Sequence, residues 1–341
     1  MKKILLTSFS FTAVLLIAAP SKSQEEPLTK ARQYFSPLPK DFFTKENSVY
    51  NNPKVINLGK MLFFERRLSV NDNISCATCH AIEYYGSAPA INQMGAIKFQ
   101  DRHAPTVLNS AGQFVQHWIG NRKDVEDQAI QSLTGPAAFG NKSLEDVEDK
   151  LSKIEGYVKL FKEAFPNDSK PISGKNIAIA IGVYERTLTT PSRFDEYLKG
   201  NTKALNQKEK KGLITFIEVG CAACHNGPLV GGNSYQKFGI VAPYWEYTKS
   251  QSIDEGRYLA TKKEEDKYVY KVPSLRNVAL TPPYFHDGSV EKLEDAVKIM
   301  AKVQLGKELT NEEIDNIVAF LNALSGNLPK NFREPPLLPS K

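Results

Sequence analysis

Apolar residues recur along this chain at the three- and four-residue spacing of helices, and strand-like alternation is scarce. In the middle of the chain, Ser143 and Asp146 are typical of a helix start, and an apolar stripe follows at Leu151, Ile154, Val158 and Phe161. Near the end, Thr310 and Glu313 form a capping box before a second stripe, which Gly326 closes: Ile314, Ile317, Val318, Leu321 and Leu324. The pattern predicts a mainly helical protein with long loops and a Pro-rich tail at 329–341 that lies across a surface.

The N-terminus has the pattern of a secretory leader. Lys2 and Lys3 precede an apolar run over 4–19, and small residues occupy the cleavage-site positions on either side of Lys22. We interpret 1–23 as a signal peptide rather than an uncleaved anchor, because the run is short of the ~20 apolar residues that a membrane span needs. The mature protein is then expected to be exported to the periplasm, with no membrane span after the signal is removed.

The composition is that of an ordinary globular protein. The 341 residues are 41% hydrophobic and 24% charged, which excludes a disordered chain and provides enough length for about two domains. Once Lys2, Lys3 and Lys22 leave with the leader, 41 basic residues face 38 acidic ones, and the net charge falls from +6 to +3. So mild a balance gives no support for a nucleic-acid partner.

All four cysteines fall in two copies of one pentapeptide, Cys-x-x-Cys-His, so none remains for a structural disulfide. This pattern is typical of covalent c-type haem, because two thiols at this spacing meet the two vinyl groups and the next histidine ligates the iron. The six residues are Cys76, Cys79 and His80, then Cys221, Cys224 and His225. A four-cysteine zinc site is disfavoured, since 141 residues separate Cys79 from Cys221. A pair of redox dithiols would leave both histidines unexplained.

The motifs recur 145 residues apart, each after a helix-like apolar stretch and before a loop with Gly and Pro. This duplication predicts a mainly α fold of two cytochrome c-like helical domains, each with one covalent c-type haem, at 24–200 and 201–328. The groups left to complete the iron coordination are three histidines and three methionines of the mature chain: His103, His117, His286, Met61, Met94 and Met300.

Further distinctive stretches follow in order: Ala-Pro-Thr-Val-Leu-Asn at 104–109, Tyr-Glu-Arg-Thr-Leu at 184–188, the run 275–286, Ile-Met at 299–300 and Gln-Leu-Gly at 304–306. With the haem motifs they make the chain, from about residue 58 to 339, resemble the bacterial di-haem cytochrome c peroxidases, which are related to the tryptophylquinone-forming di-haem enzymes.

The resemblance implies a division of labour between the haems. The haem on His225 is then the electron-entry centre, with Met300 as its distal ligand. A thioether supports a high potential because it stabilises ferrous iron. The haem on His80 is the peroxide site, Trp118 lies between the haems and carries electrons, and Gln128 is the family glutamine that hydrogen-bonds peroxide.

The resemblance also implies a calcium ion between the domains. Backbone carbonyls of Thr281 and Pro283 match the stretch that binds it, and carbonyl oxygens suit a hard cation. The family's asparagine ligand is replaced here by His103. His286 is expected near the second haem, hydrogen-bonded to a propionate or to backbone rather than bound to iron.

Two departures from the family pattern concern the peroxide site. Ala96 occupies the place of a histidine that caps the resting iron, so we expect an open first haem that needs no reductive activation. Ala138 occupies the place of the glutamate that moves a proton during peroxide cleavage. Gln128 hydrogen-bonds but is no base. The neighbouring candidates are more typical of structural or solvated residues: His117, Glu126 and Asp127.

Three functions compete. The first is a periplasmic peroxidase that reduces hydrogen peroxide to water with electrons from a small cytochrome c or cupredoxin. The second, favoured by Ala138, is a non-peroxidatic di-haem electron carrier or sensor. The third is a haem oxidase of another substrate, although Met300 argues against the quinone-forming version, which has tyrosine at that position. Family members are commonly homodimers, but no feature of this sequence requires one.

Overall fold

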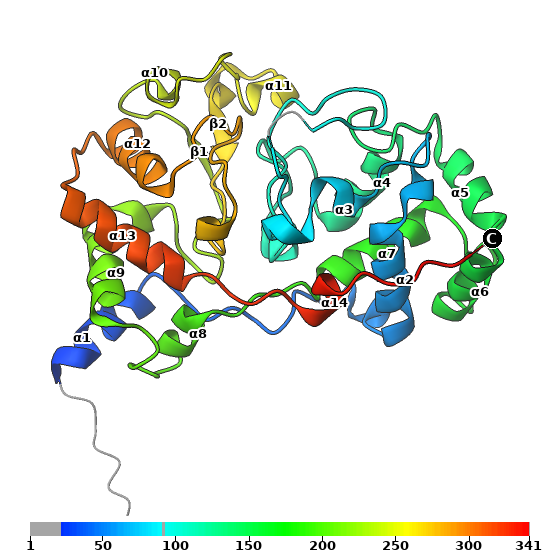
Figure 1. Ribbon diagram of the computed structural model, residues 1–341, viewed down its shortest axis with the longest axis horizontal. Helices are drawn as coiled ribbons and strands as arrows, with labels where there is room; N and C mark the ends of the chain where they lie inside the picture. The colour runs from blue at the N-terminus through cyan, green and yellow to red at the C-terminus, as the bar shows by residue number, and fades with distance from the viewer. Residues whose placement is uncertain (1–21, 91–92, 341) are drawn as a thin grey trace, which may run out of the picture.

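The computed structural model describes residues 22–90 and 93–340, so 1–21 of the predicted signal peptide lie outside the described residues (Figure 1). The longer helices are α1 Lys22–Arg32, α2 Pro53–Phe64, α4 Val125–Thr134, α5 Leu144–Ser152, α6 Glu155–Ala164, α7 Gly174–Glu185, α9 Gln207–Val219, α12 Leu293–Leu305 and α13 Asn311–Ala323. The short ones are α3 Cys76–Cys79, α8 Arg193–Leu198, α10 Tyr244–Thr248, α11 Tyr258–Thr261 and α14 Lys330–Arg333. The prediction of a mainly helical protein is confirmed. Among the described helices, none is long and apolar enough to cross a membrane.

One small antiparallel sheet accompanies the helices. Strands β1 (Tyr235–Lys237) and β2 (Val269–Lys271) pair with Tyr235 opposite Lys271. The pattern of the sequence did not predict these strands, because three residues are too few to show alternation. The strand pair lies in the lobe on the left of Figure 1, on the side that faces the other lobe.

The helices form two lobes, each around its own hydrophobic core (Figure 1). The first core gathers α2 and α4 to α7, and the second gathers α1, α8, α9, α12 and α13. The ends of the chain cross over: the segment 28–35 packs into the second core, whereas Phe332 of α14 packs into the first. Phe194 and Tyr197, which the sequence assigned to the N-terminal domain, also belong to the second core. The two cores therefore do not follow the order of the chain. The domain boundary at residue 200 stays a prediction.

The helix starts predicted at Ser143 and Thr310 are confirmed, each with a capping box. The stripe after Ser143 is not one helix, however. The chain is extended at Ile154, so α5 ends and α6 begins, and both still bury their apolar faces in the first core. Gly326 does not stop α13, which ends at Ala323. A Cβ at Gly326 would lie 2.3 Å from the carbonyl oxygen of Thr190, so the glycine permits a close approach of two backbones.

The two lobes repeat one helix crossing. In the first lobe α2 packs against α7, and a Cβ on Gly59 would lie 1.8 Å from the carbonyl oxygen of Ala180. In the second lobe α9 packs against α13, and a Cβ on Gly212 would lie 1.8 Å from the carbonyl oxygen of Asn316. Each glycine is on the helix that precedes a Cys-x-x-Cys-His motif. This agreement supports an origin of the lobes by duplication.

A buried hydroxyl joins the lobes. The side-chain amide of Asn109 donates to Thr190 Oγ1 at 2.7 Å, and that of Asn277 donates to the same oxygen at 2.8 Å. Both asparagines adopt positive φ, 60° and 61°, and each begins a 3-10 turn. All three residues have 0% exposure, so water cannot replace a lost partner.

We expect Thr190→Val to destabilise the protein by about 2–4 kcal/mol, because valine has the same shape but leaves two buried amide N–H groups unpaired. Urea unfolding of the haem-loaded protein measures this loss. Thr189→Val is the matched control, since it removes a single bond, from the Thr189 hydroxyl to the Lys40 carbonyl near the surface. Equal stability of the two variants would show that the junction carries little of the fold.

Glu185, at the end of α7, is a buried carboxyl with 4% exposure. No hydrogen bond or ion pair to its side-chain oxygens is present among the described residues. Burial raises its pKa to about 8, the charge of Glu126 adds to the shift, and Arg186 opposes it. The folded protein therefore keeps this proton at pH values where the unfolded chain has lost it.

Because the native state binds the extra proton, stability should fall as the pH rises from about 5 to 8. Glu185→Gln removes that dependence. The free energy of unfolding of the variant, measured relative to that of the unchanged protein, should therefore rise by roughly 1–3 kcal/mol from pH 5 to pH 8. Chemical unfolding at both pH values tests this, with Glu83→Gln, an exposed position, as control. A constant difference across the two pH values would contradict the buried proton.

Candidate functional site

Helix α3 is one turn that carries the first Cys-x-x-Cys pair. Its N-terminus is capped by Ser75, whose backbone N–H donates to Thr78 Oγ1 at 3.0 Å. His80 follows directly, and its Nδ1 donates to the carbonyl of Gly86 at 2.9 Å. Burial lowers the pKa of His80 to about 4, so the ring is neutral and Nε2 retains its lone pair. A neutral imidazole held in this tautomer is the form that ligates a metal.

The second motif is built in a tighter turn. Gly220 has φ 109° at the end of α9, and the backbone N–H of His225 donates to the carbonyl of Cys221 at 3.0 Å. Burial lowers the pKa of His225 to about 4, and its Nδ1 has no hydrogen-bond partner among the described residues. Gly231 lies against the ring at φ 122°, where a Cβ would come within 2.2 Å of the carbonyl oxygen of Pro273. The ring thus lies in a space that only glycine leaves open.

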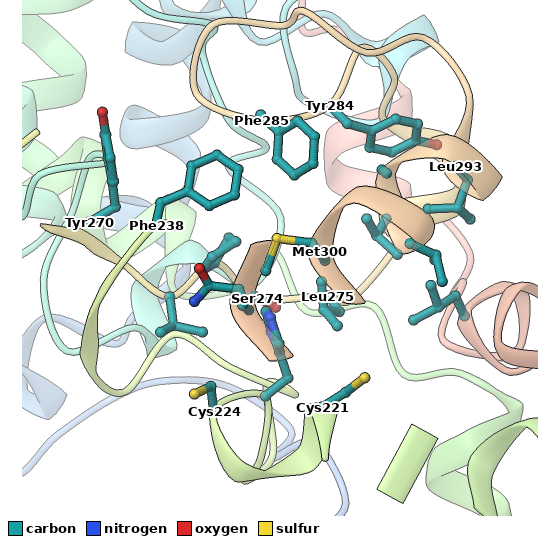
Figure 2. A pocket seen from close by; sticks show the side chains of 18 of the residues that line it. Cys221, Cys224, Phe238, Tyr270, Ser274, Leu275, Tyr284, Phe285, Leu293 and Met300 are labelled. Atoms are coloured by element: carbon teal, nitrogen blue, oxygen red, sulfur yellow. The ribbon is translucent and has the colours of Figure 1, made fainter. Parts of the chain in front are cut away.

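An apolar cavity opens beside this motif (Figure 2). Cys221, Cys224, His225 and Met300 all line it, although α12 supplies Met300 from far along the chain. Figure 2 shows Met300 between the two cysteines and a group of rings. The aromatic residues of the lining are Phe216, Trp118, Phe238, Tyr270, Tyr284 and Phe285. The structure therefore brings together the four residues that the sequence assigned to the second haem.

The lining fits a covalently attached haem. Two thiols, an imidazole and a thioether face one apolar space, and burial raises the pKa of Cys221 to about 11. The four cysteines form no disulfide. Within residues 22–90 and 93–340, no group of three or more His, Cys, Asp and Glu gathers as a metal site. The donors do not fit a four-cysteine zinc centre.

The cavity extends to the first lobe, where Ser87, His103, Pro105, Thr106 and Trp118 line it. The indole Nε1 of Trp118 donates to the carbonyl of His103 at 2.8 Å, and the carbonyl of Trp118 accepts from the backbone N–H of Lys271 at 2.7 Å. Trp118 is thus held at its indole by the first lobe and at its backbone by the second.

His286 lies in the same wall, buried beside Tyr270. The rings stack with centroids 4.5 Å apart, and Nε2 lies 3.3 Å from the Tyr270 hydroxyl. Burial lowers the pKa of His286. Asp254 lies 3.9 Å from its Nε2 and accepts two hydrogen bonds from Arg102 of the other lobe, at 2.6 and 2.9 Å. Sequence reasoning missed this ion pair, because 152 residues separate its members.

The loops that carry Ala96 and Ala138 are joined to each other. The backbone N–H of Ala96 donates to the carbonyl of Ala138 at 2.8 Å, and the next two N–H groups donate to the carbonyl of Pro136. Gln100 Nε2 lies 3.4 Å from both the Ala137 carbonyl and Cys79 Sγ, which connects this loop pair to the first motif. Gln100 is a polar residue of this region that sequence reasoning missed.

Gln128 does not line the cavity, and its amide donates to Ser132 Oγ on its own helix at 2.8 Å. The three candidates for replacing the missing glutamate already have partners. His117 bonds Asn121 at 3.0 Å, Glu126 pairs with Arg186 at 2.6 Å, and Asp127 accepts from the amide of Gln131 at 2.5 Å. None of them lines the cavity.

Thr281 and Pro283, whose carbonyls were assigned to calcium, line the cavity, as does His103. The imidazole of His103 is occupied, because its Nε2 donates to the carbonyl of Ala88 at 3.0 Å. The calcium site stays a prediction.

Comparison with known proteins agrees with this geometry. Residues 53–203 match the family model "Di-haem cytochrome c peroxidase". The chain is 41% identical over 329 residues to cytochrome c551 peroxidase of Pseudomonas aeruginosa, covering 96% of this chain and 94% of that protein. It is 30% identical to methylamine utilization protein MauG of Methylophilus methylotrophus, over 86% of this chain and 90% of the relative.

Among solved structures, a MauG-like protein associated with microbial copper homeostasis has the same fold. Its TM-score is 0.75 at 24% identity, over 88% of this chain and 97% of that one. The sequence relationship to the cytochrome c551 peroxidase covers nearly the whole length of both chains. This protein therefore belongs to the di-haem cytochrome c peroxidase family and is an oxidoreductase of the peroxidase type.

Proposed function

We propose that the chain is an exported, periplasmic di-haem peroxidase with one covalent c-type haem in each of two cytochrome c-like domains. It reduces hydrogen peroxide to water with electrons from a small redox protein, a cytochrome c or a cupredoxin. Each peroxide takes up two electrons and two protons and gives two waters. The bound haems supply the one-electron chemistry and the cleavage of the O–O bond.

The observation that carries the proposal is the position of His225 and Met300 in one apolar cavity that reaches Trp118 of the other lobe. An imidazole and a thioether are the ligand pair of high-potential c-type centres. Trp118 is fixed by hydrogen bonds at its indole and its backbone, so it can pass electrons without moving. This arrangement supports electron entry at the second haem and transfer toward the first.

On the peroxide side, His80 holds the first haem and Gln128 positions the substrate by hydrogen bonding. Ala96 and Ala138 present no acid or base, so protons reach the peroxide through water. Because position 96 has no histidine, a haem held by His80 would have a coordination position open to peroxide at rest.

A second candidate, an electron carrier without peroxidase turnover, is favoured by one observation. The loops at 94–100 and 134–140 close on each other through their backbones and offer no proton-transfer side chain at Ala96 or Ala138. Turnover kinetics separate the two functions.

We expect the isolated protein to oxidise a reduced small cytochrome c with hydrogen peroxide at similar rates before and after one-electron reduction. The physical reason is that no histidine at position 96 must leave first. Steady-state absorbance kinetics measure both rates, and His80→Ala should abolish turnover while the second haem remains reducible. Absence of turnover in either state, with both haems bound, would favour the carrier.

Replacing Met300 by alanine should lower the midpoint potential of the second haem and slow donor oxidation at least tenfold, about 1.4 kcal/mol in the barrier. Redox titration of the haem-loaded protein measures the potential. Met61→Ala, in the first core, is the control and should leave that potential unchanged. An unchanged potential in the Met300 variant would mean that another residue ligates the iron.

A further inference from the structure

Lys271, the last residue of β2, is a buried lysine with 5% exposure. Its backbone N–H donates to the carbonyl of Trp118, and its ammonium donates to the side-chain carbonyl of Gln113. An ammonium has three N–H donors, so this single side-chain partner leaves most of its hydrogen-bonding capacity unused. Gln113 and Trp118 belong to the first lobe, so Lys271 lies where the two lobes meet.

Two buried arginines of this protein have carboxylate partners, which offset the cost of burying a charge. Arg276, which also lines the cavity, bonds Asp195 at 2.7 Å with both side chains fully buried. Arg186 pairs with Glu126 at 2.6 Å. Lys271 has no carboxylate partner within residues 22–90 and 93–340, and burial alone lowers its pKa to about 8. Its charge is therefore uncompensated by the protein.

The cavity that Lys271 lines is the one that holds Cys221, His225 and Met300. A c-type haem in this cavity brings two propionate carboxylates, and the walls are mostly apolar. Arg276 is already neutralised by Asp195 and so has little charge to offer. We propose that Lys271, oriented by Gln113, is the counter-ion of a haem propionate at the inter-lobe end of the cavity, a proposal that rests on the haem attachment given above.

This pair has two consequences. A fixed positive charge near the haem stabilises the reduced iron, which carries one positive charge fewer, and so raises the potential of the electron-entry centre. The same residue holds the backbone of Trp118, so the propionate, Lys271 and Trp118 form one continuous contact from the second haem to the first lobe. Lys271 acts as a positioning residue and not as a reactant.

The test is a redox titration of the second haem in the full protein loaded with both haems. Lys271→Met and Lys271→Gln both remove the charge, and the glutamine retains polar contacts if methionine disturbs the fold. Both should shift the equilibrium of electron exchange with a reference dye by about tenfold toward oxidised haem, which is 59 mV for a one-electron couple. Lys271→Arg should restore the potential. Lys263→Met, at an exposed lysine that does not line the cavity, is the control and should leave the potential unchanged.

An unchanged potential in both neutral variants, with two haems bound, would overturn the proposal, and so would an equal shift in the Lys263 variant. Neither result bears on peroxide turnover. Conversely, a protein that binds two haems without peroxidase turnover would contradict the proposed function and leave the Lys271 measurement valid, because a potential does not depend on turnover.

Discussion

The position of the candidate site depends on one buried hydroxyl. Thr190 Oγ1 accepts from Asn109 of the first lobe and Asn277 of the second, and the segments leading into these asparagines supply cavity wall from both lobes. Apolar burial is non-directional and cannot fix the register of two lobes by itself. Short hydrogen bonds between buried groups can fix it, because a shift of either turn would leave a buried side-chain amide without its acceptor. The junction, together with the hydrogen bond from Lys271 to Trp118, therefore sets how close Trp118 comes to the wall that carries His225.

The buried charges of the cavity, like its buried polar groups, need partners. Arg276 is fully buried and matched by Asp195, an arrangement that ties the 275–277 turn to α8 and leaves no net charge. Lys271 is buried without such a partner. An isolated buried ammonium is costly, so its retention makes physical sense when a carboxylate arrives with a ligand. The cavity is thus apolar along its walls and cationic where the lobes meet, which matches the amphiphilic shape of a haem.

The features that could be predicted from the sequence are those that residues close together in the chain determine. The Cys-x-x-Cys-His spacing, the caps at Ser143 and Thr310 and the helical class all depend on neighbouring residues, and the resemblance placed Met300 beside His225. The contacts at Thr190, Lys271 and Arg102 join segments more than 80 residues apart, so no local pattern reveals them. The break between α5 and α6 was missed because both helices bury apolar residues in one core, and the stripe continues across an extended residue.

The two alanines that we assign to the peroxide side lie in loops that pack closely against each other. A Cβ on Gly95 would lie 2.3 Å from the Ala137 backbone, and one on Gly140 would lie 2.8 Å from Ile97, so each loop has a glycine where the other approaches. Three backbone hydrogen bonds then close the pair. Opening it to bring a side chain toward the iron would cost roughly 0.5–1.5 kcal/mol for each bond, besides the lost packing. A loop held in this way is unsuited to a ligand that must come and go. The absence of a capping histidine and the fixed loop pair are therefore consistent with each other, and together they favour a peroxide site that is formed before the substrate arrives.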